Sequence, residues 1–292
     1  MRIIRPHASS GGKHPWVASF LEQLRKENLS TNTLRSYRSD LEVFLLWSNS
    51  SPDTVTPVDV MRYWRHLIRE NRLKPASINR KLEALRRFCR WAEGAGKLQS
   101  NPVAEVKRER PVRDLRTVEL TESEVTALLR AAGQSKHGMA KRNYALLQIL
   151  LQTGVLVSEI AALRIDDAVR RDRTGSLKVR QGEGAREREI SLNTVVRRAL
   201  NAYLKTRKPL HPKAPLITSQ TGAAISIRAI QLIVAELARR AKITRIRVTA
   251  RTIRHTFAFK FLKRNPGKLV DLAALLGHQS LDATAVYLRS PQ

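Results

Sequence analysis

The chain has 292 residues, enough for two domains with separate cores, and 42% of its residues are hydrophobic, which excludes a disordered basic tail. Lysine and arginine number 54 against 25 aspartate and glutamate residues, so the net charge is +29, divided into +10 for residues 1–112 and +19 for residues 113–292. This excess is far beyond what solubility needs and favours nucleic acid as a partner of both halves; a ribosome-like or merely basic protein is the alternative.

The first 104 residues predict a basic arm and a compact helical unit. Residues 1–14 contain glycine, serine and histidine and are expected to form a loose arm. Over residues 15–104 the apolar residues recur at helical spacing, which predicts four or five helices. Ser30 is a candidate N-cap, Thr56 precedes a proline in the first turn of another helix, and Gly94 is well placed to end a further one.

Basic side chains lie on the polar faces of these expected helices. Such groups can follow the phosphates of a nucleic acid, and each phosphate they neutralise steepens the salt dependence of binding. A solvated charged face is the alternative for any single one of them. The candidate DNA-binding residues of this unit are Arg35, Arg38, Asn79, Arg80, Lys81, Arg86 and Arg87.

Residues 105–118 predict a linker, because they are charged, contain a proline and show no clean period. A second domain is expected over residues 119–292. Thr121 and Glu124 form a capping-box pattern at its start, and Gly154 ends an apolar helical run.

The hydrophobic period then changes from about 3.6 to 2. Residues 176–181 and 186–192 alternate on either side of a glycine-rich turn, which predicts an antiparallel hairpin, and three helical stretches follow. The predicted fold class is therefore mainly α, with a small antiparallel β hairpin or sheet in the C-terminal domain (α+β).

Four residues in the last fifth of the chain have side chains suited to phosphodiester chemistry. Arg251 and Arg254 lie three residues apart on one side of a helical turn, His278 follows a glycine, and Tyr287 comes nine residues later. Arginines bind the non-bridging oxygens of a phosphodiester, a histidine handles its proton, and a tyrosine hydroxyl can attack its phosphorus. A surface arginine, a capping histidine and a core tyrosine are the alternative interpretation.

The order and spacing of these parts resemble the tyrosine site-specific recombinases, the phage integrase and Xer-type family, over nearly the whole chain. The resemblance implies a two-domain DNA clamp, with a core-binding domain over residues 15–104 and a catalytic domain over residues 119–292. It also implies phosphoryl transfer without a metal or another cofactor. In that chemistry Tyr287 is the nucleophile and forms a 3′-phosphotyrosine, His278 hydrogen-bonds the phosphate, and Arg254 clamps it.

Three positions depart from the family pattern. Arg251 stands where a histidine or lysine is usual; it keeps a cation but cannot act as a base at neutral pH. Leu156 stands where the family has its first clamping arginine, whose loss is expected to cost about 10²–10³ in rate. Glu183 stands where a hairpin lysine would protonate the leaving oxygen, a step worth about 10²–10⁴. Lys178 and Arg186 lie nearby on the hairpin and are further candidate DNA-binding residues, but neither refills the position of Leu156, and no neighbouring arginine obviously does.

The expected function is DNA recombination and integration, by strand cleavage and rejoining at a specific duplex. We expect the protein to associate with itself on DNA, as a dimer or tetramer, or with another recombinase. A catalytically impaired or inactive family member that binds DNA as an accessory or regulatory protein is one alternative. A decayed mobile-element product is another.

The sequence also favours a particular compartment. Cys89 is the only cysteine, so no disulfide can form within the chain, which fits a reducing cytoplasm. No apolar run approaches the roughly 20 residues that a membrane span needs. The N-terminus is short and basic and lacks the apolar middle of a signal peptide. We expect a cytoplasmic, nucleoid-associated protein of a prokaryote that does not bind a membrane.

Overall fold

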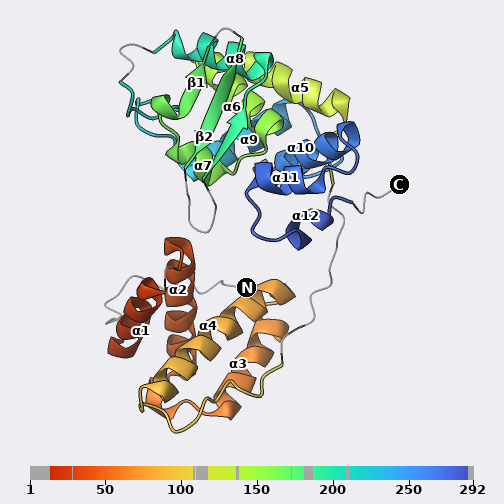
Figure 1. Cartoon of the computed structure of the whole chain (residues 1–292). Coiled ribbons are helices and arrows are strands. Elements are labelled where there is room, and N and C mark those ends of the chain that lie inside the picture. Colours follow the sequence, from red (N-terminus) through yellow and green to blue (C-terminus); the bar gives the residue numbers. More distant parts are fainter. Residues whose placement is uncertain are drawn as a thin grey trace. The chain divides into compact units, whose positions relative to one another are not determined.

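The structure is a computed structural model of the whole chain (Figure 1). It describes residues 14–27, 29–107, 109, 118–135, 138–171, 173–180, 187–207 and 211–288. The chain divides into two compact units, Met1–Asp114 and Leu115–Gln292, each with a hydrophobic core of its own. The boundary falls within the predicted linker over residues 105–118, most of which lies outside the described residues.

Helices form the first unit around one core. They are α1 (Pro15–Lys26), α2 (Thr31–Ser48), α3 (Pro57–Arg69) and α4 (Pro75–Gly94), with a short 3-10 helix η1 (Pro52–Thr54) before α3. Aromatic rings meet edge to face inside the core, Phe20 with Phe88 at 5.5 Å and Phe44 with Tyr63 at 5.0 Å between centroids. The predicted helical module is confirmed.

Local capping begins several helices where the sequence predicts. The Ser30 hydroxyl accepts the Thr33 backbone N–H at 3.0 Å at the start of α2. Thr56 forms a capping box with Asp59 at the start of α3. Thr121 does the same in the second unit, where its N–H donates to Glu124 at 2.9 Å. Each cap is completed within three residues, so it needs no tertiary contact to form.

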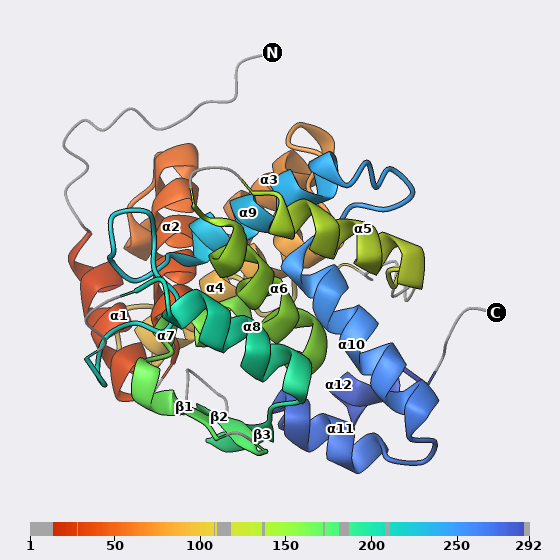
Figure 2. The ribbon, with the colours of Figure 1, turned by 90° about the horizontal axis from the view of Figure 1, so that it is seen from above.

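The second unit packs around α6 (Ala140–Thr153). Leu146, Leu147 and Ile149 of α6 are completely buried, so this helix is apolar over most of its surface. It is flanked by α5 (Glu122–Gly133), α8 (Thr194–Leu204) and α10 (Ala250–Arg264), as Figure 2 shows. The other helices described are α7 (Val157–Ala162), the 3-10 helix η2 (Ile165–Asp167), α9 (Ile227–Arg240), α11 (Leu269–Leu276) and α12 (Asp282–Ala285).

A small antiparallel sheet covers part of this unit, with strand order β1 (Ala168–Arg170), β2 (Gly175–Val179) and β3 (Arg188–Ser191). Leu177 pairs with Ala168 on one side and Ile190 on the other, and all three side chains are buried. Strands β2 and β3 confirm the predicted hairpin. Strand β1 was not predicted, because three residues are too few to show an alternation. The predicted turn with Glu183 and Arg186 lies outside the described residues.

The turn after α6 brings its backbone against α10. Gly154 has φ +63°, and a Cβ on it would lie 2.3 Å from the Phe257 ring of α10. Glycine is therefore required both for the backbone angle and for the close approach. Next to this turn, Phe259, Leu272 and Tyr287 belong to a small core that holds the last helices together.

None of the helices in the described part of the chain combines the length and apolar character that crossing a membrane requires. Across the same residues, His, Cys, Asp and Glu side chains do not gather in groups of three or more that could hold a metal ion.

Candidate active site

Arg254 lies on α10 and is 8% exposed. Its Nη1 donates to the Gly154 carbonyl at 2.6 Å, and its Nη2 donates to the Leu276 carbonyl at 2.8 Å and to Nε2 of His278 at 3.1 Å. A guanidinium has five N–H donors, so Nε–H and one Nη1–H are left without a partner among the described residues. Burial lowers the pKa of Arg254, but an arginine stays charged at neutral pH. This fixed cation can therefore still donate to an anionic ligand.

His278 follows Gly277, which ends α11 with φ +72°. Because an arginine can only donate, Nε2 of His278 accepts from Arg254, and Nδ1 carries the proton. Nδ1 donates to the hydroxyl of Thr284, a completely buried residue, at 2.7 Å. Burial, followed by the charges of Arg254 and Arg188, lowers the pKa of His278, so the imidazole is neutral at pH 7.

Tyr287 is 6% exposed, and its hydroxyl lies 2.8 Å from Nδ1 of His255. Its ring packs 5.4 Å from the His255 ring and 5.4 Å from the Phe259 ring, the latter edge to face. Burial raises the pKa of Tyr287, while the charges of Arg254 and Arg251 act in the opposite direction. Burial, Arg251 and Arg254 lower the pKa of His255 to about 4, so this imidazole is also neutral at pH 7.

The four candidate catalytic residues gather around α10. Arg251, which is exposed, lies one turn before His255 and acts through its charge on both His255 and Tyr287. Arg254 contacts His278 directly, and the next residue, His255, contacts Tyr287. Sequence reasoning assigned His255 no role. Its place directly after Arg254 becomes informative only once the side of α10 that meets Tyr287 is known.

The surroundings of Leu156 contain a cation from another element. Leu156 is 41% exposed, and its N–H donates to Glu159 at 2.7 Å. Glu159 also binds Arg188 of β3 through two hydrogen bonds of 2.7 and 2.9 Å. The Nε of Arg188 donates to the Leu275 carbonyl at 2.7 Å, and a Cβ on Gly277 would lie 2.9 Å from its Nη1. The sequence offered no obvious arginine near position 156; the structure brings Arg188 to the carboxylate three residues beyond it.

Two candidate DNA-binding residues fasten helices of the first unit together. Arg80 and Lys81 of α4 both pair with Asp40 of α2, whose side chain is 3% exposed, and the Lys81 Nζ to Asp40 Oδ1 distance is 2.9 Å. A buried carboxylate needs such partners, so these contacts serve the fold. Arg80 keeps 44% of its side chain exposed. Arg35 and Arg38, on α2, are exposed and half-buried respectively.

Three further candidates on α4 make internal contacts. The Asn79 side chain donates to the carbonyl of Glu109 at 2.7 Å and accepts its N–H at 2.8 Å. The Nη2 of Arg86 donates to the Val106 carbonyl at 2.7 Å. Arg87 forms a partly exposed ion pair, of a kind that contributes little to stability. Contact of these residues with DNA stays a prediction.

On the hairpin, Lys178 pairs with Glu187 at 2.7 Å, and this hydrogen bond raises the pKa of Lys178. Both side chains are more than half exposed, so the pair leaves Lys178 accessible to other anions. Arg186 lies outside the described residues.

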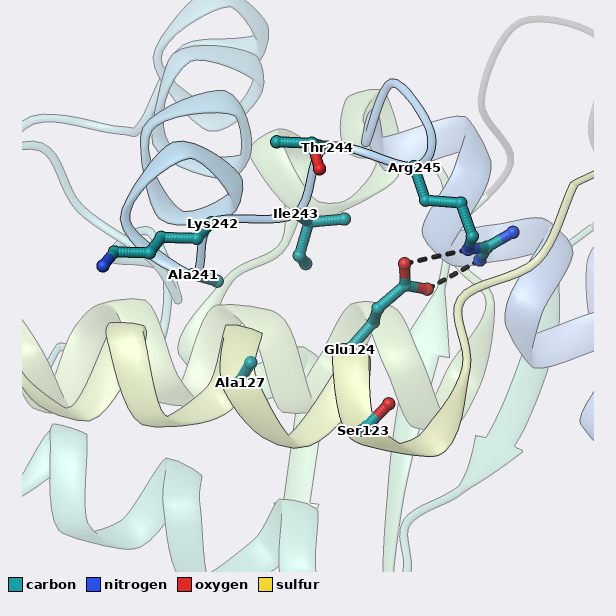
Figure 3. A pocket seen from close by; sticks show the side chains of 8 residues that line it. All are labelled: Ser123, Glu124, Ala127, Ala241, Lys242, Ile243, Thr244 and Arg245. Atoms are coloured by element: carbon teal, nitrogen blue, oxygen red, sulfur yellow. Dashed lines mark hydrogen bonds and ion pairs between the residues drawn. The ribbon is translucent and has the colours of Figure 1, made fainter.

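An open pocket lies between α5 and the segment after α9 (Figure 3). Glu124 and Arg245 form an ion pair of 2.7 Å on its lining. The other lining residues are Ser123, Ala127, Ala241, Lys242, Ile243 and Thr244. None of the four candidate catalytic residues lines this pocket, so it is separate from the cluster around α10.

Comparisons with known proteins agree on one family. Residues 119–292 match the model described as "Phage integrase family", and residues 17–96 match "Phage integrase, N-terminal SAM-like domain". The chain is similar to tyrosine recombinase XerC of Oceanobacillus iheyensis, with 31% identity over 289 residues, 93% of this chain and 90% of the relative. It is similar to XerD of Lacticaseibacillus casei, with 28% identity over 281 residues, 94% of this chain and 93% of the relative.

Solved structures are similar over the same length. The crystal structure of XerA recombinase has a TM-score of 0.52 and 27% identity, covering 95% of this chain and 94% of that one. A lambda integrase dimer bound to a COC′ core site has a TM-score of 0.72 over 94% of this chain and 76% of that one; at 16% identity this likeness concerns the fold alone. Because the family model matches more than half of the sequence, the chain belongs to the phage integrase family of tyrosine site-specific recombinases, whose reaction is DNA cleavage and rejoining.

Proposed function

We propose that this chain cleaves and rejoins DNA strands at a specific duplex, with Tyr287 as the nucleophile. The Tyr287 oxygen attacks a backbone phosphorus and forms a 3′-phosphotyrosine, the bond from phosphorus to the 5′ oxygen breaks, and the 5′ hydroxyl of another strand reverses the step. The observation that carries the proposal is the convergence on α10: Arg254 contacts His278 while its neighbour His255 contacts the Tyr287 hydroxyl.

The roles follow from the donors that remain available. Arg254 binds a non-bridging oxygen through an N–H group without a partner among the described residues, and the exposed Arg251 supplies a second cation. His278 hydrogen-bonds the phosphate through Nε2 in the tautomer that carries the proton on that nitrogen; the Thr284 hydroxyl then donates to Nδ1, and the phosphate replaces the Nε2 contact with Arg254. Positioning and charge stabilisation of this kind need no metal ion or other cofactor.

Double-stranded DNA is the proposed partner of both units, which act as a clamp. The charges of +10 for residues 1–112 and +19 for residues 113–292 support this. One structural relative is a lambda integrase dimer bound to a core site, and another is XerH bound to its difH substrate in a pre-cleavage complex. We therefore propose that this chain also associates with itself on DNA, or with another recombinase, in the cytoplasm of a prokaryote.

A second function, specific DNA binding with weak or no cleavage, is favoured by one observation. At the position where the family has its first clamping arginine, the apolar side chain of Leu156 is 41% exposed. Arg188 already uses both of its Nη groups to bind the carboxylate of the neighbouring Glu159. Such a site lacks one of the positive charges that would hold the phosphate, and the protein would serve as an accessory of an active recombinase.

Trapping on a nicked duplex distinguishes the two functions. The duplex carries the site that the protein itself selects from a random-sequence pool. The nick lets the short fragment that bears the freed 5′ hydroxyl diffuse away, so the covalent complex accumulates. Cleavage predicts an adduct with the unsubstituted protein and none with Tyr287→Phe. Tight, site-specific protection of the duplex without any adduct would instead support the binding function.

A further inference from the structure

We propose that His255 accepts the proton of the Tyr287 hydroxyl as that oxygen attacks the phosphorus. The inference rests on the proposed function and names the proton acceptor for the same site. The geometry points to it: the hydroxyl oxygen and Nδ1 of His255 are 2.8 Å apart, although 32 residues separate them in sequence. This distance is within the range over which a general base takes a proton directly.

The other groups beside Tyr287 cannot take this proton. Arg251 and Arg254 remain charged and have no lone pair to offer at neutral pH. His278 uses Nε2 to accept from Arg254 and Nδ1 to donate to Thr284, so both of its nitrogens are occupied. Within the described residues, His255 is the one base that contacts the Tyr287 hydroxyl.

The contact also does more than hold the ring in place. Phe259 packs edge to face against Tyr287 at 5.4 Å, from the same side of α10 and one turn beyond His255. Tyr287 is further enclosed by the small core of Phe259, Leu272 and Leu276. Since packing already fixes the ring, the polar contact is available for proton transfer.

In the cleavage step the Tyr287 oxygen forms a bond to phosphorus, its proton moves to Nδ1 of His255, and the bond from phosphorus to the 5′ oxygen breaks. The leaving oxygen takes a proton from water. The charged and titratable groups that act on His255, among the described residues, are Arg251 and Arg254 on its own helix and Tyr287 from the segment after α12. An anionic phosphodiester opposes the effect of the two arginines and makes His255 a better acceptor when DNA is bound.

The test measures the rate of adduct formation in the full-length chain with His255→Asn. Asparagine can still accept the Tyr287 hydroxyl hydrogen bond, but its amide is not a base. The nicked duplex carries sulfur in place of the bridging 5′ oxygen, because a thiolate leaves without being protonated, so the rate then reports activation of the nucleophile. His211→Asn, an exposed histidine of the same unit, is the matched control.

With His255 as the base, the unsubstituted protein and His211→Asn should react at rates that are flat between about pH 6 and pH 9. His255→Asn should be slower by about 10²–10⁴ at pH 7. Its rate should rise about tenfold per pH unit, because attack must then await ionisation of Tyr287, whose pKa is raised by burial.

If His255→Asn reacts at the unsubstituted rate and its rate does not change with pH, His255 is not the base, while Tyr287 can still be the nucleophile. Absence of an adduct with the unsubstituted protein would overturn the proposed function, and with it the role of His255 as proton acceptor. A ¹⁵N NMR spectrum of the unsubstituted protein provides a readout that needs no variant to fold. Nδ1 of His255 must be the unprotonated ring nitrogen, and a proton found on it would overturn the proposal.

Discussion

Replacing Arg188 with methionine is expected to destabilise the second unit strongly. Arg188 joins three elements, since it binds Glu159 of α7 from β3 and donates to the Leu275 carbonyl of α11. Only 9% of the Arg188 side chain and 5% of the Glu159 side chain are exposed. The substitution therefore leaves a buried carboxylate without its counter-charge.

Removing one partner of a buried ion pair costs about 3–5 kcal/mol, because the remaining charge is unpaired in a medium of low polarity. In Arg188→Met, Glu159 keeps the Leu156 N–H as its one hydrogen bond among the described residues, and the more distant charge of Arg254 still acts on it. Adding Glu159→Gln removes the unpaired charge, and the glutamine carbonyl can still accept the Leu156 N–H. The double variant should thus regain most of the lost stability, although it has one more substitution.

Urea denaturation can separate the two units spectroscopically. The four tryptophans, Trp16, Trp47, Trp64 and Trp91, all belong to the first unit. Fluorescence therefore follows the first unit, whereas far-UV circular dichroism follows both. Arg188→Met should shift the dichroism transition of the second unit to lower urea and leave the fluorescence midpoint unchanged.

Lys178→Met is the control, since it breaks an exposed pair with Glu187 on the same hairpin and should leave the urea midpoint almost unchanged. An equally small loss for Arg188→Met would refute the reasoning. A double variant no more stable than Arg188→Met would also contradict it, because the unpaired charge of Glu159 would then not be the source of the loss.

Three further predictions concern the site and its charge. Leu156→Arg combined with Glu183→Lys should increase the yield of trapped adduct, and no gain would mean that these positions do not correspond to the family's arginine and lysine. DNA affinity should fall steeply as salt rises, and a shallow slope would mean that most of the +29 charge faces solvent. Because the pKa of His255 is lowered to about 4 in the folded chain, the unfolded chain binds the proton first, so stability should fall as pH drops from about 6.5 towards 4. The melting temperature of His255→Asn should fall less over that range than that of the unsubstituted protein. An equal fall would mean that protonation of His255 does not cause the loss of stability.

The helical modules and their starts could be predicted from sequence because their causes are local. A cap such as Ser30 or Thr121 is completed by a residue three positions away, and apolar spacing shows which face of a helix is buried. The hairpin was visible in the change of period, but β1 was not, because its three residues pair only when β2 is already in place.

The residue types of the site were also readable from the sequence, since Arg251, Arg254, His278 and Tyr287 occur in the order and spacing of a known family. Their working contacts were not. The pairing of His255 with Tyr287 spans 32 residues and that of Arg188 with Glu159 spans 29. Contacts of this range depend on how α10, α11 and β3 pack against one another. Tertiary packing alone therefore decided that His255, to which the sequence assigned no role, contacts the Tyr287 hydroxyl and that Arg188 of the hairpin binds Glu159.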